Sequence, residues 1–390
     1  MAKEKTKLER TGWSSNFTLV GTAVVNDRTF KLDQRSQNSD WISNRMNLGV
    51  NCGEKNGTVY CELWGGYGEN RENKIYVHGK KEDNTDDYQN QYVIAWEDRN
   101  DDEITSSIGR GCFTQVGLEK TSAGTTFVKP FLSAYDAIEY ANEHLVNGMK
   151  IRVYGNLKYQ TYNGMTQVKK EITRITLAND DEPLGAKFTQ TVLLTKDSFG
   201  AIDKKTGFAP IDAIVLEYFK TYNGYDVGGN VPLHKTFEFD FNKFLDKPEI
   251  IKQIKDKFFT VKKGVTEIKF EGEFIESGST VKITEDDLDE DVKFMIATGI
   301  KTLEEVMKDA AGFGSVTRRM VITRPVTKAI EVDGGGIKTE IDKVERRYEE
   351  SDLILDCLTP KEEFDEEKFS MPVPEIEQQD DESWLNELGL

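Results

Sequence analysis

Cysteine is scarce in this sequence and does not occur with the spacing of a metal or redox site. The four cysteines lie far apart and form no C-x-x-C pair: they are Cys52, Cys61, Cys112 and Cys357. Zinc knuckles and disulfide frameworks need cysteines at short or regular spacings, so neither is indicated. We interpret all four as buried thiols and predict no metal and no other cofactor.

Long apolar runs are also missing. No segment approaches the roughly 20 apolar residues that span a membrane. The N-terminal MAKEKTKLER lacks the apolar core of a signal peptide. We therefore expect no membrane partner and a cytoplasmic location.

The sequence shows none of the common catalytic motifs. It contains no G-x-x-x-x-G-K-[ST], no H-E-x-x-H and no G-x-S-x-G, and its three histidines, His78, His144 and His234, are isolated. We predict that the protein is not an enzyme and has no catalytic residues.

Positive charge is in deficit. The chain has 51 Lys and Arg against 69 Asp and Glu, a net charge of −18. Phosphate binding draws on positive potential, so such a chain is at first sight a poor partner for nucleic acid. Half of the excess, however, lies in the last 31 residues, where eleven acids stand against two lysines for a net charge of −9. The rest of the chain therefore carries less negative charge than the total suggests and repels phosphate less.

Residues 359–390 have the composition of a disordered acidic tail with an apolar tip. The final DDESWLNELGL places three apolar side chains on one side of a short helix: Trp384, Leu385 and Leu388. An acidic segment that ends in an apolar tip is typical of a docking peptide. We expect these three residues to bind a partner with a basic-rimmed apolar pocket.

The first half of the chain has the short, punctuated apolar segments of a β protein. After a flexible basic arm at 1–16, strand-like segments occupy 17–25, 41–50, 57–64 and 74–80. A helix with a 3.6-residue apolar stripe follows at 133–148, where Ser133 can cap it. About five strands with a helix inserted before the fourth predict a Greek-key barrel of the oligonucleotide/oligosaccharide-binding (OB) type in residues 17–180.

A similar pattern recurs in residues 184–358. Superposing Gly155 on Gly272 aligns Ile151 with Ile268, and each copy has a predicted helix just upstream. The outward positions of the second copy carry two glutamates and one lysine, so we expect this barrel to be structural or oligomerising. The predicted fold class is mainly β with inserted helices: two tandem OB-fold-like Greek-key barrels and a disordered acidic tail.

The most basic stretch is a predicted hairpin at 148–177, with a two-residue Asn163-Gly164 turn. Cations that follow phosphates and aromatic rings that stack on bases are what single-stranded nucleic acid needs. We therefore predict single-stranded DNA as the ligand. Phosphate contacts are assigned to Lys150, Arg152, Lys158, Lys169, Lys170 and Arg174. Base stacking is assigned to Trp41, Trp64, Tyr154, Tyr159 and Tyr162, with Arg45 and Tyr60 on the neighbouring strands.

The first predicted barrel resembles the bacterial and phage single-stranded DNA-binding protein family. The similarity lies in FTLVG, NRMNLGVN, VYCELWG and HLVNGMKIRVYGNLKYQTYNGMTQVKKEI, and an acidic tail with an apolar tip is also a family feature. The resemblance implies a non-catalytic OB-fold protein that coats and protects single-stranded DNA during replication, repair and recombination. It also implies that the tail recruits replication and repair proteins, and that the protein is phage-encoded and acts in the host cytoplasm.

This sequence departs from the family in two respects, and other function classes stay open. The family usually has one barrel per chain, and the tip here lacks the family's terminal Pro-Phe. An acidic interaction protein, either a virion component or a DNA mimic, would bind no oligonucleotide. A metal-dependent nuclease would cleave DNA with Mg²⁺ or Mn²⁺. The oligomeric state is also open, and a homo-oligomer is among the alternatives.

Overall fold

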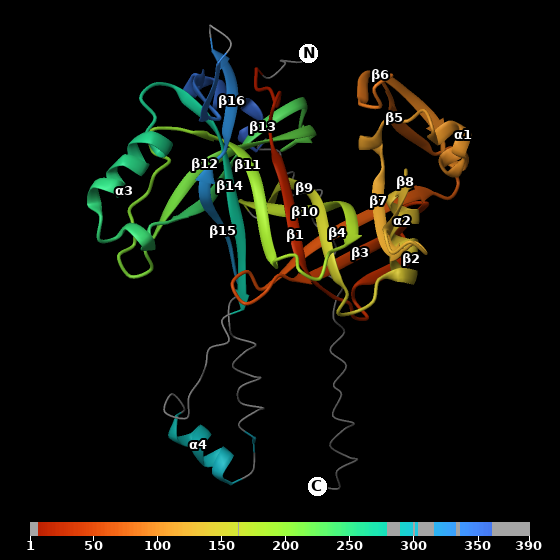
Figure 1. The fold of residues 1–390 in the computed structure, drawn as a ribbon, viewed down its shortest axis with the longest axis horizontal. Helices are drawn as coiled ribbons and strands as arrows, with labels where there is room; N and C mark the ends of the chain where they lie inside the picture. The colour runs from red at the N-terminus through yellow and green to blue at the C-terminus, as the bar shows by residue number, and fades with distance from the viewer. Residues whose placement is uncertain are drawn as a thin grey trace, which may run out of the picture.

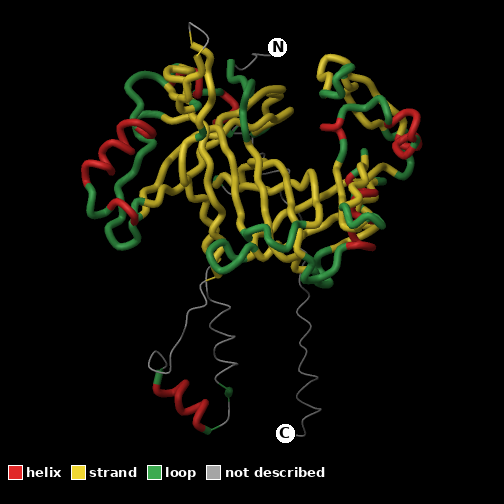
Figure 2. Tube along the Cα trace, viewed as in Figure 1, coloured by secondary structure: helices red, strands yellow, loops and turns green. Residues whose placement is uncertain are grey.

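The structure is a computed structural model that describes residues 7–162, 164–278, 289–298, 301–302, 316–332 and 336–360. Strands make up most of the described chain, and helices are few and short (Figure 2). The prediction of a mainly β protein with inserted helices is therefore confirmed. The predicted tail beyond residue 360, including its apolar tip, lies outside the described residues.

Five strands of the first half close into a barrel. They are β1 (Ser15–Val24), β3 (Trp41–Asn51), β4 (Thr58–Gly68), β9 (Lys150–Tyr162) and β10 (Met165–Leu177). β1 pairs with β3, β3 with β4, β10 with β9 and β9 with β1, all antiparallel, while β4 and β10 complete the circuit in parallel. This circuit, with a helix before its fourth strand, is that of a Greek-key OB-type barrel.

Further elements lie against this barrel. They are β2 (Phe30–Arg35), β7 (Thr114–Lys120), β8 (Thr126–Phe131) and the helix α2 (Ala134–His144). The hydroxyl of Ser133 accepts a hydrogen bond from the Tyr135 amide, which confirms the predicted cap. The helix ends earlier than predicted because Leu145 adopts an extended backbone conformation.

Residues 74–112 form a small lobe that projects from the first barrel (Figure 1). It contains β5 (Lys74–Lys80), β6 (Asp86–Ala95), η1 (Trp96–Asn100), α1 (Asp102–Thr105) and η2 (Arg110–Cys112). The acidic segment 81–110 interrupts the strand pattern, and the sequence predicts an elaborated connection there with one strand at 92–96. That strand begins earlier and pairs with β5 outside the barrel, because Val77, Ile94 and Ile108 form a separate small core.

The second half repeats the barrel circuit. Its strands are β11 (Gly185–Leu194), β12 (Phe208–Tyr222), β13 (Tyr225–Asp240), β14 (Val265–Gly278) and β15 (Val316–Pro325). β11 pairs with β12, β12 with β13, β15 with β14 and β14 with β11 in antiparallel fashion, and β13 pairs with β15 in parallel. Strand for strand this is the circuit of the first barrel, as the sequence repeat predicted.

The remaining elements flank the second barrel. The predicted helix at 248–259 divides into α3 (Pro248–Ile254) and a π-helical turn, η4 (Lys255–Phe259). The others are η3 (Asn242–Phe244), α4 (Glu290–Ala297), β16 (Thr327–Val332), β17 (Gly336–Ile341), β18 (Lys343–Tyr348), η6 (Glu350–Leu353) and η7 (Asp356–Leu358). None of the helices in the described parts of the chain is long and apolar enough to cross a bilayer.

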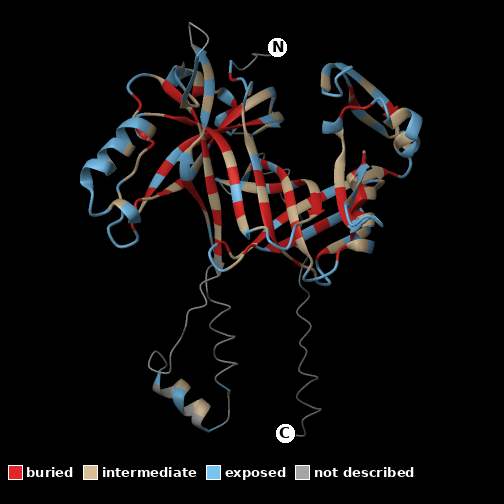
Figure 3. Ribbon diagram, in the orientation of Figure 1, coloured by how far each residue is buried: buried red, intermediate tan, exposed pale blue. Residues whose placement is uncertain are grey.

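A shared strand pairing joins the barrels into one sheet. β1 and β11 are antiparallel neighbours, and buried side chains run continuously through both barrels (Figure 3). Gly155 lies opposite Phe17 and Gly272 lies opposite Phe188. The superposition of Gly155 on Gly272 is thus confirmed at the level of strand register.

The N-terminal arm differs from the prediction. Residues 1–6 are outside the described part, but Leu8 is buried in an apolar cluster on the second barrel, with Trp13 packed against it. Arg10 donates a hydrogen bond to the Glu217 carboxylate at 3.1 Å. Leu8 and Arg10 thus contact the second barrel, where the sequence predicts a flexible arm; their partners lie too far away in the sequence for a local pattern to indicate them.

Candidate nucleic-acid interface

The outer surface of β3 and β4 is the most exposed aromatic face of the first barrel. Strand alternation sends Met46, Leu48 and Val59 into the core and turns the intervening residues outward. We call this surface the outer β3–β4 face; its side chains are those of Trp41, Arg45, Asn47, Tyr60, Glu62 and Trp64.

Three aromatic rings lie on this face. The Trp41 and Trp64 rings lie 5.9 Å apart between centroids, and Trp64 is 56% exposed. Tyr60 is 52% exposed and lies opposite Gly49 across the strand pair. A Cβ atom at Gly49 would come within 3.2 Å of the Tyr60 ring, so glycine lets this ring lie close to β3. Exposed rings such as those of Tyr60 and Trp64 are what stacked bases require, whereas the Trp41 ring is half-buried and has the Arg71 guanidinium 5.5 Å from its centroid.

A carboxylate with two cations lies between these rings. Glu62 accepts a hydrogen bond from the Arg45 guanidinium at 2.9 Å and lies 3.8 Å from the Lys169 ammonium. Arg45 and Lys169 both remain about half exposed, so either cation can turn toward an added anion. Exposed ion pairs of this kind are worth only about 0 to 1 kcal/mol, which a phosphate can outcompete.

The tip of the β9–β10 hairpin extends the basic surface. Lys158 and Lys169 lie directly opposite each other on the outer side, and Tyr162 is exposed. The hydroxyl of Thr161 shares a hydrogen bond with the Tyr222 hydroxyl at 2.8 Å, which holds the tip against the second barrel. The two strands are joined by a two-residue connection as predicted, although Asn163 itself lies outside the described residues.

At the other end of β9, Lys150 and Arg152 bind the linker between the barrels. The Lys150 ammonium donates to the backbone carbonyls of Asp180 and Glu182, both at 2.6 Å. The Arg152 guanidinium pairs with the Glu182 carboxylate, which raises the pKa of Arg152. These two side chains point outward as predicted, but they fix the linker between the barrels. Their assignment to phosphate contact stays a prediction.

Two other predicted residues point inward. Tyr159 is 3% exposed and donates a hydrogen bond to Gln190, and its burial raises the pKa of the phenol. The Lys170 ammonium is buried, donates to Glu276 at 2.7 Å and lies 4.8 Å from the Phe274 ring centroid. Neither can reach DNA, so stacking by Tyr159 and phosphate contact by Lys170 are corrected to packing roles.

Tyr154 and Arg174 are half-buried and lie opposite each other on β9 and β10. The Nε atom of Arg174 is buried and finds no partner among the described residues. The structure therefore places Trp41, Arg45, Tyr60, Trp64 and Lys169 on one surface, with Lys158 opposite Lys169, while Tyr162 is exposed at the hairpin tip. The binding role of these residues stays a prediction. The predicted docking residues Trp384, Leu385 and Leu388 lie outside the described residues.

One basic residue of the second barrel reaches this site, and the sequence reasoning did not assign it. A groove of about 160 Å³ lies between the barrels, bordered by Tyr60 and Lys169 on one side and by Glu276 and Arg318 on the other. The Arg318 side chain is 69% exposed and lies 3.9 Å from Glu276. The run SVTRRMVITR marked β15 as basic, but only the fold brings it beside Tyr60.

The middle of the corresponding surface of the second barrel is covered by other described residues, although Tyr218 on β12 is exposed. β12 is the counterpart of β3, and its outward residues Ile214 and Leu216 are buried in a cluster that includes Leu8 and Leu353. Leu8 near the N-terminus and Leu353 near the C-terminal end of the described residues thus cover part of the outer surface of β12, whereas the outer surface of β3 is not covered in this way. A chiefly structural role for the second barrel stays a prediction.

The cysteines match their predicted role in three cases. Cys52, Cys61 and Cys357 are buried, and burial raises the pKa of Cys52 to about 12. Cys112 is only half-buried and lies in the lobe, which corrects the prediction of four buried thiols. Within the described ranges, no three metal-ligating side chains come together to hold a metal ion.

Comparisons with known proteins give a weak likeness in fold. A scan against family models and a search of curated proteins found no match. Among solved structures, the wild-type single-stranded DNA binding protein from Thermus aquaticus aligns with a TM-score of 0.33 and 9% identity, over 83% of this chain and 97% of that one. A deletion mutant of the same protein gives a TM-score of 0.30 and 10% identity over 68% and 88% of the two chains. Scores this low do not carry a function over to this chain.

Proposed function

We propose that the protein binds single-stranded DNA along the outer β3–β4 face and the hairpin tip, with little preference for sequence. The observation that carries this proposal is the contact between half-buried Trp41 and exposed Trp64, with Arg45 opposite Trp64 in the strand pair. The partly exposed cations Arg45 and Lys169, both at Glu62, lie on the same surface, so base and phosphate contacts are available in one place. No proton transfer or bond cleavage is required of these residues.

The path of the strand follows from where the cations lie. From Trp64 and Arg45 the DNA runs past Tyr60 and Lys169 into the groove between the barrels, where Arg318 contacts a further phosphate. The second barrel then acts as a scaffold that holds Arg318 and the hairpin tip in position. This division of work explains why the middle of its own β12 surface is covered.

The cellular role we propose rests on the sequence. The protein coats single-stranded DNA during replication, and its acidic tail recruits replication or repair proteins through Trp384, Leu385 and Leu388. In the absence of DNA the tail's carboxylates compete for the cations of the face. The alternative is an acidic interaction protein that does not bind nucleic acid.

A fluorescence titration with oligo-dT tests the proposal. Stacking on Trp41 and Trp64 should quench tryptophan emission, and about four phosphate contacts predict that log K falls with log salt at a slope of about −3. No quenching and no binding at low salt would overturn the proposal in favour of the acidic interaction protein.

A further inference from the structure

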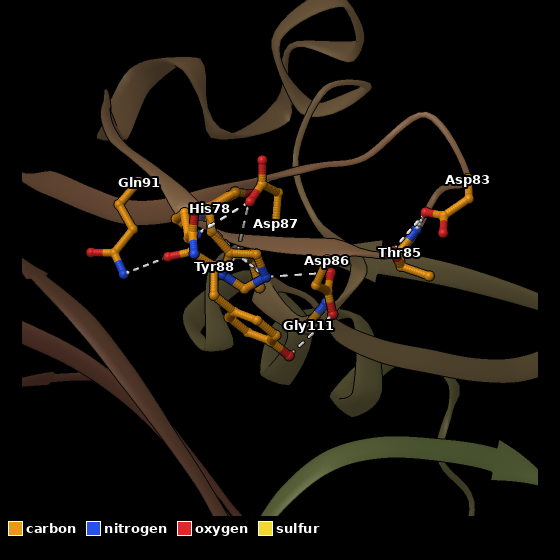
Figure 4. Close-up of polar contacts among 10 residues, drawn as sticks. His78, Asp83, Thr85, Asp86, Asp87, Tyr88, Gln91 and Gly111 are labelled. Atoms are coloured by element: carbon orange, nitrogen blue, oxygen red, sulfur yellow. Dashed lines mark hydrogen bonds and ion pairs between the residues drawn. The ribbon is translucent and has the colours of Figure 1, made fainter. Parts of the chain in front are cut away.

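A cysteine, a histidine and an aspartate lie close together in the lobe, away from the proposed DNA face, and Figure 4 shows His78 and Asp86 with Tyr88 beside them. The Cys112 sulfur is 3.3 Å from Nδ1 and 3.8 Å from Nε2 of His78, and Nε2 is 3.3 Å from Oδ1 of Asp86. The Tyr88 ring packs on the imidazole, with ring centroids 4.6 Å apart. The three groups come from η2, β5 and β6, so only the folded lobe brings them together.

The backbone around Cys112 is built closely against the histidine and the aspartate. A Cβ atom at Gly109 would lie 2.5 Å from the His78 ring and 2.6 Å from the Asp86 carboxylate. A Cβ atom at Gly111 would lie 2.9 Å from the same carboxylate. Only glycine at these two positions allows the segment 109–112 to approach so closely, so the chain that leads into Cys112 enforces the arrangement.

The charge of Asp86 favours one tautomer of His78. Asp86 accepts from the Gly111 amide and from the Tyr88 hydroxyl, and the amide contact is the main reason that the pKa of Asp86 is lowered. The ionised carboxylate therefore takes the Nε2–H of His78, which leaves Nδ1 as the acceptor for the Cys112 thiol. Burial raises the pKa of that thiol, so it rests protonated and needs a base.

The contacts around the imidazole ring favour a proton relay. The Asp86 carboxylate lies at Nε2 and the Cys112 sulfur lies nearer to Nδ1 than to Nε2, and among the residues that the structure describes no three metal-ligating side chains come together to hold a metal ion. A base held and oriented by a third group is instead the arrangement that activates a nucleophile.

The surrounding amides limit the chemistry that the thiol can support. The amide of Gly111 donates to Asp86, that of Cys112 to the Gly109 carbonyl and that of Phe113 to the Arg110 carbonyl. None of these three amides is left to stabilise the oxyanion of an acyl-transfer reaction. Thiol–disulfide exchange needs no oxyanion hole, because the charge develops on the leaving sulfur.

We infer that Cys112 is a modification site that reacts with low-molecular-weight disulfides, with His78 as general base and Asp86 as the group that orients it. The Cys112 sulfur attacks one sulfur of the disulfide while its proton passes to Nδ1 of His78. A new S–S bond forms, the reagent's S–S bond breaks, and the proton is given to the departing thiolate. Cys112 is oxidised to a mixed disulfide and the released thiol is the reduced product.

The test uses the full chain with dithiodipyridine, whose reaction releases a chromophore. One of the four thiols should react rapidly in the folded protein, peptide mapping should place it at Cys112, and Cys112→Ser should abolish the fast phase. His78→Asn should slow this phase at least about tenfold at neutral pH, a modest value for loss of a general base. His144→Asn is the matched control, since His144 lies on α2 outside the lobe, and it should leave the rate unchanged.

Two readouts separate base catalysis from simple exposure of the thiol. The groups that face His78 are Asp86, Tyr88 and Cys112, so between pH 8 and 7 the wild-type rate should fall less steeply than that of His78→Asn. Asp86→Asn should also slow the reaction and serves as the second variant if His78→Asn does not fold. A His78→Asn or Asp86→Asn protein that is folded by circular dichroism and reacts as fast as wild type would overturn the inference, as would equal reactivity of all four thiols.

Discussion

Phe17 and Phe188 lie directly opposite each other where β1 of the first barrel pairs with β11 of the second. Each is also opposite a glycine on its other side, Gly155 for Phe17 and Gly272 for Phe188. Equivalent residues that meet across an antiparallel pair relate the two barrels by a local two-fold axis. The equivalent first strands of the two barrels, β1 and β11, are thus also the strands that join them.

Substituting either glycine should destabilise the protein. A Cβ atom at Gly155 would clash with the Glu171 carbonyl and lie 2.5 Å from the Phe17 ring, and one at Gly272 would clash with the Phe188 ring and lie 2.5 Å from the Val321 carbonyl. We expect Gly155→Ala and Gly272→Ala each to lower the free energy of unfolding by about 1 to 3 kcal/mol, as overpacking does. Urea denaturation measures this change.

The control for that pair is Gly185→Ala, because a Cβ atom at Gly185 meets no atom within 4 Å. It should change the urea midpoint little. Equal effects of all three substitutions would show that the two phenylalanine–glycine contacts are not the constraint we describe.

Two adjacent lysines should behave in opposite ways. Lys169→Ala should weaken oligo-dT binding and reduce the salt slope by about 0.7, the value for one phosphate contact on a single strand. Lys170→Ala should leave buried Glu276 without its close partner and cost about 3 kcal/mol of stability, with little change in binding by the folded protein. Binding titrations and urea denaturation of both variants check this, and a reversed pattern would place the wrong lysine at the DNA.

Removing the Glu62 carboxylate should tighten DNA binding. Glu62 holds Arg45 and Lys169 and adds a negative charge to the face, so Glu62→Gln should raise affinity for oligo-dT about threefold at low salt, and less as salt screens the charge. Glu54→Gln makes the same charge change at an exposed turn position and should have a smaller effect. Weaker binding by Glu62→Gln would mean that Glu62 positions the cations for DNA instead of competing with it.

Deleting residues 360–390 should also raise affinity. The tail carries a net charge of −9, and its carboxylates compete with DNA phosphates for the same cations. The gain should be largest at low salt and should vanish as the Debye length shortens toward a few ångströms near 1 M. The measurement is the affinity for oligo-dT of the full and the shortened chain at several salt concentrations. If the deletion leaves the affinity unchanged at every salt concentration, only the proposed docking role of the tail remains.

The alternation of inward and outward residues in β9 could be predicted from the sequence. The same alternation shows that Tyr159 points inward, which the predicted site did not take into account. Ile151 and Val153 are buried as expected, and Tyr159 has the same odd-numbered parity, so it too points inward. Lys170 shares parity with buried Ile172 in the same way. Strand periodicity alone could therefore have removed both residues from the predicted site.

Other features depend on contacts between distant parts of the chain. Lys150 and Arg152 were placed on the correct side of the strand, but their partner Glu182 lies in the linker, and periodicity does not reveal it. The burial of Leu8 on the second barrel and the position of Arg318 beside Tyr60 likewise join segments more than 150 residues apart. Such partners are fixed by tertiary packing and not by local pattern.

The central claim is that bases stack on the outer β3–β4 face, and Trp64→Ala tests it most directly. Losing one stacking ring costs about 1 to 3 kcal/mol, so the Kd for oligo-dT should rise about 5- to 150-fold at fixed salt. Tyr218→Ala removes a similarly exposed ring from the second barrel and should leave the Kd unchanged. A folded Trp64→Ala protein that binds oligo-dT as tightly as wild type would contradict the account.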